Sequence, residues 1–269
     1  MIQRWRYVAA SVAGTSHEKT SLPCQDSFGH LVVPNPGDEE VLVLVASDGA
    51  GSAKRAEAGA ALACASTLEL VQDYFGSGGC ISGIDRTIAA SWIATIKGRL
   101  ATAALAEGDE VRDFACTLLV AVIGPADAAF IQLGDGAIVV SSEGEGSWAF
   151  VFWPQHGEFA NTTNFLVDQE AERLFEFDSS SGVIRDVAVF TDGIENLVLN
   201  KREKIVHAPF FESVFPSVRA LTSEGLDRGL SKALMAYLAS SAFNEKTDDD
   251  KTLLLASRRH RALQAPETS

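Results

Sequence analysis

The sequence predicts an α+β domain in which two β-sheets pack face to face and pairs of helices cover their outer sides. Short apolar or alternating runs follow one another without intervening helices, as in antiparallel sheets. Stretches with helical spacing come in neighbouring pairs, at 52–75 with 84–106 and near 208–221 with 225–243. A parallel sheet would instead alternate strands with helices, so this order favours layered antiparallel sheets.

The first half of the chain supplies two strands and the first helix pair. Residues 5–13 alternate as in a half-buried strand, and residues 41–47 form a continuous apolar run. Ser52 is a good N-cap, so we expect the first long helix to begin there. The glycine-rich segment 76–80 ends that helix, and 84–106 carries a second apolar stripe.

The second half is predicted to contain mainly strands, followed by the second helix pair. Turn residues divide the strand-like region, and a polar, poorly periodic stretch after it is typical of a surface loop or flap. In chain order we expect strands within 113–153, the flap at about 154–172, strands at 173–178 and 183–191, the two helices, and a strand at 251–257. Residues 1–257 should therefore form a single domain, with 258–269 as a flexible tail.

Charge and cysteine content exclude several classes of protein. The 269-residue chain has a net charge of −14, which disfavours nucleic acid and anionic membranes as partners. No apolar stretch reaches the roughly 18 residues of a membrane span, and the N-terminal segment alternates like a strand rather than a signal peptide. The four cysteines are scattered without a CxxC pair, which argues against zinc and favours reduced thiols in the cytoplasm.

Four aspartates stand where apolar runs end, and their side chains are the main candidates for chemistry. Asp48, Asp135 and Asp192 each precede a glycine after a strand-like run, and Asp249 is the middle of an aspartate triplet before the last strand. A strand end fixes a carboxylate in space, and glycine lets a ligand approach the backbone. Carboxylates from separate strands are typical ligands of Mg²⁺ or Mn²⁺. Each motif alone is also ordinary turn chemistry, and Asp135 could simply close a hairpin.

Taken in order, five motifs make the chain resemble the metal-dependent protein phosphatases of type 2C, in their bacterial branch. They are GTSHEKTSLPCQDSFG, SDGAGS, LGDGAI, FTDGIENL and DDDKTLLLA. The resemblance spans nearly the whole chain, and the order is far more specific than any single motif. It implies a four-layer αββα sandwich of two antiparallel β-sheets flanked by antiparallel helix pairs, in agreement with the pattern of strands and helices.

The resemblance also implies a metal centre with two Mn²⁺ or Mg²⁺ ions and a third, weaker site. Asp48 would bridge the two ions, and the carbonyl of Gly49 would reach one of them. Asp192 and Asp249 would complete the coordination of the first ion. Asp135 would share the third ion with Asp192.

The implied reaction is hydrolysis of phosphoserine or phosphothreonine in proteins. Asp48 and Asp192 would take part in catalysis through a water that the two metals share and ionise. Asp26 would support the metal site without binding a metal directly, or would reach a metal through a bound water. Because that water attacks phosphorus directly, the displacement would need no covalent intermediate.

Three positions depart from the best-known members of the family. Gln25 stands where a glutamate often precedes the first aspartate, Ser21 replaces the usual phosphate-binding arginine, and Ala50 replaces a histidine proposed as general acid. His17 or Lys19 could supply the missing phosphate contact. These departures affect efficiency and substrate choice more than the class of reaction.

The leading hypothesis is thus an intracellular phosphatase that reverses the action of a serine/threonine kinase on a phosphorylated protein. The departures leave open a non-catalytic phosphoprotein-binding module of the same fold, or a hydrolase of a small phosphorylated metabolite. Asn161, Thr162 and Thr163 in the flap could face the substrate or make ordinary loop hydrogen bonds. Lys54 and Arg55 could help attract phosphate or could be solvated helix residues.

Overall fold

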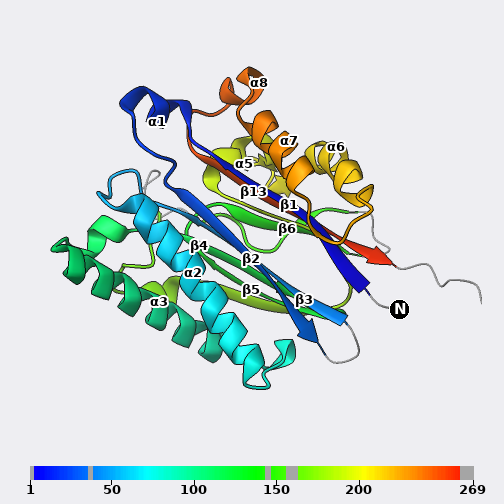
Figure 1. Ribbon diagram of the computed structural model, residues 1–269, viewed down its shortest axis with the longest axis horizontal. Coiled ribbons are helices and arrows are strands. Elements are labelled where there is room, and N and C mark those ends of the chain that lie inside the picture. Colours follow the sequence, from blue (N-terminus) through cyan, green and yellow to red (C-terminus); the bar gives the residue numbers. More distant parts are fainter. Residues whose placement is uncertain (1–2, 36–38, 143–146, 156–162, 261–269) are drawn as a thin grey trace, which may run out of the picture.

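Two β-sheets packed face to face form the centre of the protein, and helices cover both outer sides (Figure 1). The computed structural model describes residues 3–35, 39–142, 147–155 and 163–260. The predicted fold class, an αββα sandwich of two largely antiparallel sheets, is confirmed.

The first sheet has five strands, and every neighbouring pair is antiparallel. Its order across the sheet is β2 (Asp26–Asn35), β3 (Glu39–Asp48), β4 (Leu118–Ile123), β5 (Asp127–Leu133) and β8 (Glu176–Ser181). In this sheet Asp26 lies opposite Asp48, because β2 and β3 pair in that register. The first two acidic motifs therefore meet at one end of the sheet.

The second sheet has six strands and brings the two ends of the described chain together. Its order is β12 (Gly225–Leu226), β1 (Gln3–Val12), β13 (Lys251–His260), β9 (Ile184–Phe190), β6 (Ala137–Ser142) and β7 (Ala149–Phe150). Only the short contact between β1 and β12 is parallel among the described pairs. The first and last strands are thus interior neighbours, side by side in Figure 1.

The helices form two groups, one on each sheet. α2 (Ala56–Gly76) and α3 (Arg86–Glu107) cover the five-stranded sheet, while α5 (Asp192–Val198), α6 (Ala208–Arg219) and α7 (Arg228–Leu238) cover the six-stranded sheet (Figure 1). The remaining described elements are short: α1 (Thr15–Thr20), α4 (Ala171–Leu174), α8 (Ser241–Asn244), the 3₁₀ turns Ile81–Gly83 and Val111–Phe114, and the strand pair β10 (Leu199–Asn200) and β11 (Ile205–Val206). None of the described helices has the length and apolar character needed to cross a bilayer.

Strand β3 shows why the sequence folds into layers. Val43 and Val45 point outward into the core beneath α2 and α3, whereas Leu42 and Leu44 point into the core between the sheets. All four side chains are fully buried, so the continuous apolar run reflects a strand covered on both faces. Trp5 of β1 closes the inter-sheet core from the opposite sheet.

Two predicted elements were misplaced by local signals. The first long helix begins at Ala56 rather than at Ser52, and the N–H of Arg55 donates instead to the carbonyl of Asp113. The strand expected at the end of 113–153 is reduced to the two residues of β7. In both places, tertiary contacts determine the backbone more strongly than the local apolar pattern.

Other differences come from caps and from cross-strand pairing. The helix expected at 225–243 is divided, because the side chains of Asp227 and Ser240 each cap a new helix, α7 and α8. The segment expected as a strand at 173–178 begins instead with the end of α4, and its strand, β8, runs on to Ser181. Strand β2 was not predicted at all.

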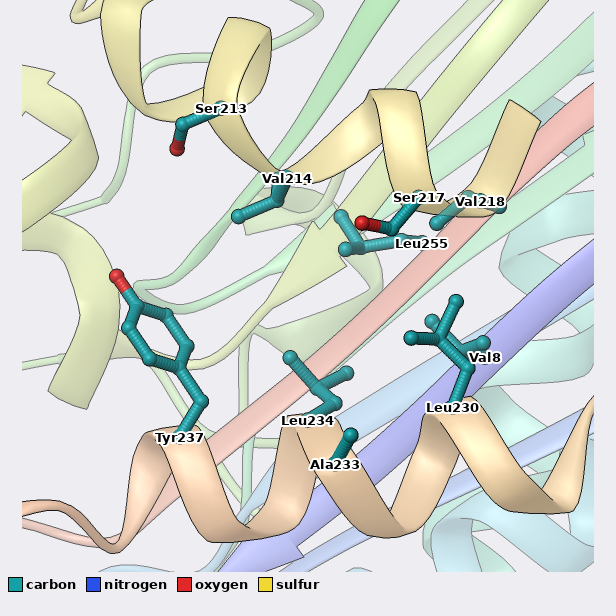
Figure 2. Close-up of a pocket in the computed structure, with 10 residues that line it drawn as sticks. All are labelled: Val8, Ser213, Val214, Ser217, Val218, Leu230, Ala233, Leu234, Tyr237 and Leu255. Carbon is teal, nitrogen blue, oxygen red and sulfur yellow. The ribbon is translucent and has the colours of Figure 1, made fainter. Parts of the chain in front are cut away.

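The two helices α6 and α7 lie apart over the six-stranded sheet and leave an apolar groove between them (Figure 2). The groove encloses about 280 Å³ and its floor includes Val8 and Leu255 of the sheet. Leu234 from α7 and Val218 from α6 form its walls, and Tyr237 stands at one end. This groove belongs to the helix layer and is separate from the acidic site described next.

Candidate metal centre

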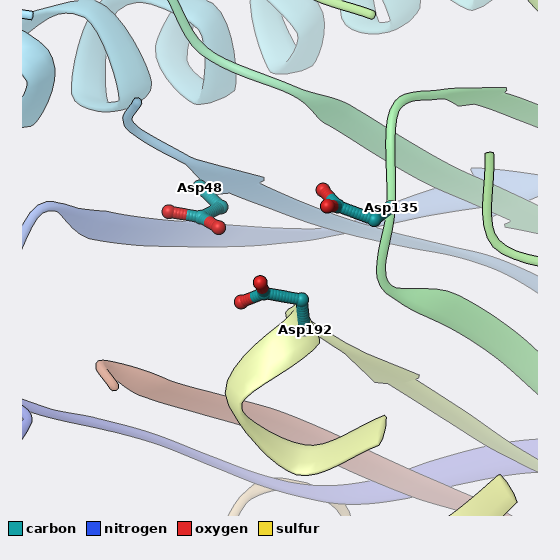
Figure 3. A group of neighbouring side chains, drawn as sticks. All are labelled: Asp48, Asp135 and Asp192. Carbon is teal, nitrogen blue, oxygen red and sulfur yellow. The ribbon is translucent and has the colours of Figure 1, made fainter. Parts of the chain in front are cut away.

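Three carboxylates that are far apart in the sequence converge where the two sheets meet. Asp48 is the last residue of β3, Asp135 lies in the turn between β5 and β6, and Asp192 is the first residue of α5, directly after β9. Each can offer a carboxylate oxygen such that all three oxygens lie within 4.8 Å of one another (Figure 3). One small cation could therefore contact all three side chains.

The turn that carries Asp135 does not close a hairpin, so that alternative is wrong. Strand β5 belongs to the five-stranded sheet and β6 to the six-stranded sheet, and the turn crosses from one to the other. Gly134 and Gly136 have φ values of +98° and +81°, a region that favours glycine. The hydroxyl of Thr163 donates to Asp135 at 2.5 Å, and the N–H of Gly136 donates to Glu195 at 2.7 Å. The first bond holds the side chain of Asp135, and the second holds the turn that directs it toward Asp48 and Asp192.

Asp249 and Asp250, in the last aspartate triplet, lie in different surroundings. Asp249 is exposed to the cavity that the three carboxylates line. Asp250 is buried, and its two oxygens accept hydrogen bonds from the N–H groups of Gly14 at 2.6 Å and Gln25 at 2.5 Å and from Nδ1 of His17 at 2.9 Å. With Asp250 engaged inside the protein, Asp249 is the member of the triplet that faces the site.

Asp26 lies behind Asp48 and is buried. Its Oδ2 accepts a hydrogen bond from the hydroxyl of Thr191 at 2.7 Å, whereas its Oδ1 has no hydrogen-bond partner. Burial raises the pKa of Asp26 to about 7. The amide oxygen of Gln25 is a second buried acceptor without a partner, and this residue lines the cavity. Unsatisfied oxygen acceptors are what a cation site or its bound water requires.

The electrostatics of the cluster also call for a cation. Burial, followed by the neighbouring carboxylates, raises the pKa of Asp48 well above its usual range and raises the pKa of Asp192 to about 8. The pKa of Asp249 is raised as well, mainly by burial. Within the described residues, no lysine or arginine forms an ion pair with Asp48, Asp192 or Asp249. A set made only of carboxylate and carbonyl oxygens fits Mg²⁺ or Mn²⁺.

The cavity around the cluster encloses about 590 Å³. Gly49 and Ala50 line it beside Asp48, and Ser52 lines it in the turn before α2. The N–H of Gly49 donates to the carbonyl of Gln25 at 3.2 Å, which ties the first two acidic motifs together. The cavity is open enough for a phosphoryl group to reach the carboxylates.

Of the cationic residues proposed to contact phosphate, only one lines the cavity. His17 lines the cavity, but Lys19 is exposed on α1 and does not. Lys54 and Arg55 both pair with Asp109, and neither lines the cavity. Asn161 and Thr162 lie outside the residues that the structure describes.

Several residues of the site were not singled out by the sequence. Thr191 and Glu195 flank Asp192 in the chain, and Asp250 directly follows Asp249. Asp168 comes from the predicted flap and lines the cavity, together with Thr163, which the sequence did offer as a flap residue that could face the substrate. The available signal was position, because Thr191, Glu195 and Asp250 are each within three residues of a motif aspartate. Hydrogen-bonded partners, however, cannot be identified from spacing alone.

Comparison with known proteins agrees with this arrangement. Residues 13–238 match the family described as Protein phosphatase 2C. The Serine/threonine-protein phosphatase 3 of Escherichia coli strain K12 is 39% identical over 252 residues, which cover 94% of this chain and 98% of that protein.

Solved structures share the fold at low sequence identity. The catalytic domain of the phosphatase PstP, solved in complex with two manganese ions, has a TM-score of 0.59 at 14% identity and covers 96% of this chain and 100% of its own. The phosphatase Stp1 from Staphylococcus aureus has a TM-score of 0.57 at 15% identity, covering 93% and 94%. PppA, a regulatory component of the type VI secretion system in Pseudomonas aeruginosa, has a TM-score of 0.60 at 14% identity, covering 96% and 100%.

Proposed function

The chain belongs to the protein phosphatase 2C family, and on this premise we propose that it removes phosphate from phosphoserine and phosphothreonine in proteins with the help of divalent cations. It is a protein phosphatase of the family's bacterial branch. The observation that carries the proposal is the convergence of Asp48, Asp135 and Asp192, whose carboxylate oxygens lie within 4.8 Å of one another at the wall of one cavity.

Two Mn²⁺ or Mg²⁺ ions would be held by Asp48, the carbonyl of Gly49, Asp192 and Asp249, and a third ion by Asp135 with Asp192. When bound, such ions lower the pKa of a shared water and offset charge on the phosphoryl oxygens, so that hydrolysis needs no covalent intermediate. The raised pKa values of the carboxylates support this assignment, because a divalent cation removes their mutual repulsion.

The protein's own contribution is to hold these ligands in place. Thr191 donates to Asp26 and accepts from the N–H of Thr252, and in this way it links β2, β9 and β13 behind the cluster. Asp48 is fixed at its backbone, where its N–H donates to the hydroxyl of Thr117 at 2.9 Å. The amide oxygen of Gln25 takes the place of a carboxylate and would accept from metal-bound water with one less negative charge.

The natural substrate would be a phosphorylated protein, the product of a serine/threonine kinase. With a net charge of −14, the protein cannot attract phosphate through its overall field, so the affinity for phosphate must arise locally in the cavity. A non-catalytic binding module has no observation in its favour, since the full set of motif carboxylates is present. Comparison of rates on phosphothreonine peptides and on small phosphorylated metabolites would identify the substrate class.

A metal titration tests the proposal. Protein treated with a chelator should not hydrolyse p-nitrophenyl phosphate or a phosphothreonine peptide, and Mn²⁺ should restore turnover. Asp249→Asn should raise the Mn²⁺ concentration for half-maximal activity by about tenfold or more, because a ligand is lost. Asp248→Asn is the matched control, since Asp248 is exposed and outside the cavity. Full activity in excess chelator would refute the mechanism.

A further inference from the structure

The cavity contains little that could bind an anion apart from the proposed metals. Among the described residues that line it, His17 has the only side chain able to carry a positive charge, and it faces five carboxylates. Ser21, which stands where an arginine is common in the family, ends α1 in a left-handed conformation with φ of 57° and does not line the cavity. Any direct protein contact of positive charge with substrate phosphate must therefore come from His17 within this set.

The ring of His17 is held in one orientation by a buried partner. Its Nδ1 lies 2.9 Å from Oδ2 of Asp250, which is 2% exposed. Because the same carboxylate accepts from the N–H groups of Gly14 and Gln25, it acts as an acceptor throughout, and the proton of this contact lies on Nδ1. The other ring nitrogen, Nε2, is then left for the cavity. A carboxylate behind an imidazole is a general means of orienting the ring for work at its far nitrogen.

The same carboxylate fixes the distance between His17 and the metal ligands. Asp250 follows Asp249 in the chain, and its N–H donates to a side-chain oxygen of Asp249 at 2.9 Å. The approach of α1 is close enough that a Cβ on Gly14 would lie 2.3 Å from the carbonyl oxygen of Asp248, so glycine is required there. One buried group thus positions His17, Gln25 and Asp249 around one cavity.

We propose that His17 contacts the phosphoryl group of the substrate through Nε2, and that Asp250 is the positioning residue that aims it. This inference rests on the proposed function and adds a substrate contact from the chain itself. This contact requires the imidazolium form of the ring, in which Nδ1–H donates to Asp250 and Nε2–H donates to a phosphoryl oxygen in a charge-assisted hydrogen bond. The contact would take the place of the absent arginine.

The test compares His17→Ala, His17→Gln and Lys19→Ala in Mn²⁺-loaded protein. His17→Ala should raise both the KM for p-nitrophenyl phosphate and the inhibition constant of inorganic phosphate by about tenfold or more, the effect expected for loss of one hydrogen bond to a charged group. His17→Gln should recover part of this affinity, because its amide N–H₂ can reach the position of Nε2. Lys19→Ala should change neither constant, since Lys19 is exposed outside the cavity.

Mn²⁺ affinity, measured by calorimetry, separates a phosphate contact from an effect on the metals. It should be the same in His17→Ala and in wild-type protein; a parallel loss of Mn²⁺ and phosphate affinity would overturn the inference. Unchanged KM and phosphate inhibition in His17→Ala, with Mn²⁺-dependent wild-type turnover, would also overturn it and leave the proposed function standing. If the wild-type protein has no such turnover, the proposed function itself fails.

Two measurements test the role of Asp250. Nitrogen-15 shifts of the His17 ring should show the proton on Nδ1 in wild-type protein, a readout that needs no substitution of Asp250, and a proton on Nε2 alone would overturn the positioning role. Asp250→Asn should weaken phosphate inhibition in wild-type background but add less than about twofold in the His17→Ala background, because residues that act as one unit are not additive. Equal effects in both backgrounds would contradict the proposed coupling.

Discussion

Replacing Asp192 with asparagine should abolish turnover and yet make the metal-free protein more stable. The folded-state pKa of Asp192 is about 8, against an ordinary value of 3.8, mainly because of burial and then because Asp135 and Asp249 lie nearby. Between these two values the folded protein binds more protons than the unfolded chain, so this carboxylate lowers stability as the pH rises from about 4 to about 8. Asparagine keeps the shape and removes the charge.

The size of the gain follows from the pH interval. From 3.8 to neutral pH is about three pH units, each worth about 1.4 kcal/mol, which sets an upper limit of about 4 kcal/mol at pH 7. Part of that repulsion is relieved in the wild-type protein when neighbouring carboxylates take up protons instead, so a measured gain of about 1–3 kcal/mol is expected. At pH 4 the gain should nearly vanish, because Asp192 is then protonated in the folded state.

Urea unfolding in the presence of a chelator measures this effect at both pH values. Asp73→Asn is the matched control, because Asp73 is exposed on α2 and far from the cluster. With saturating Mn²⁺ the order should reverse, since only the wild-type protein gains the full stabilisation from bound metal. The reasoning is refuted if the metal-free variant is less stable than wild type at pH 7, or if its gain is equal at both pH values.

Two further substitutions test the packing around the cluster. Gly193→Ala should destabilise the protein by about 3 kcal/mol or more, because an added Cβ would lie 1.9 Å from the carbonyl oxygen of Asp250; Gly98→Ala, in open space on α3, should instead be neutral or stabilise by up to about 1 kcal/mol in the same thermal-unfolding assay. Thr191→Val should cost about 1–3 kcal/mol in urea unfolding, because it leaves buried Asp26 without its donor, and a variant as stable as wild type would contradict the role of that bond.

The sequence was most informative where one signal decides the backbone. Strand β3 is apolar on both faces, so its existence and the position of Asp48 at its end could be predicted, although it extends from Glu39 to Asp48 rather than over 41–47 alone. The glycines after Asp48, Asp135 and Asp192 marked close approach, and at Gly193 that approach is to the carbonyl of Asp250, directly before β13. Convergence of the aspartates then followed from the family motifs rather than from spacing.

The sequence was least informative where long-range pairing decides the backbone. Strand β2 contains Gly29, His30 and Pro34, which interrupt any alternation of apolar and polar residues. It forms because it pairs with β3 along its whole length in an antiparallel ladder. Asp250 looked like one member of an acidic run, but in the fold it is buried among N–H donors from the opposite end of the chain. Such a role depends on pairing of β1 with β13, which no local pattern reveals.

The neighbouring positions of β1 and β13 also bear on how the protein is made. Strand β13 lies between β1 and β9, so a nascent chain that has not yet reached Lys251 lacks an interior strand of the six-stranded sheet. Asp249 is synthesised just before that strand. Synthesis must therefore pass this point before the six-stranded sheet can close with all of its interior strands.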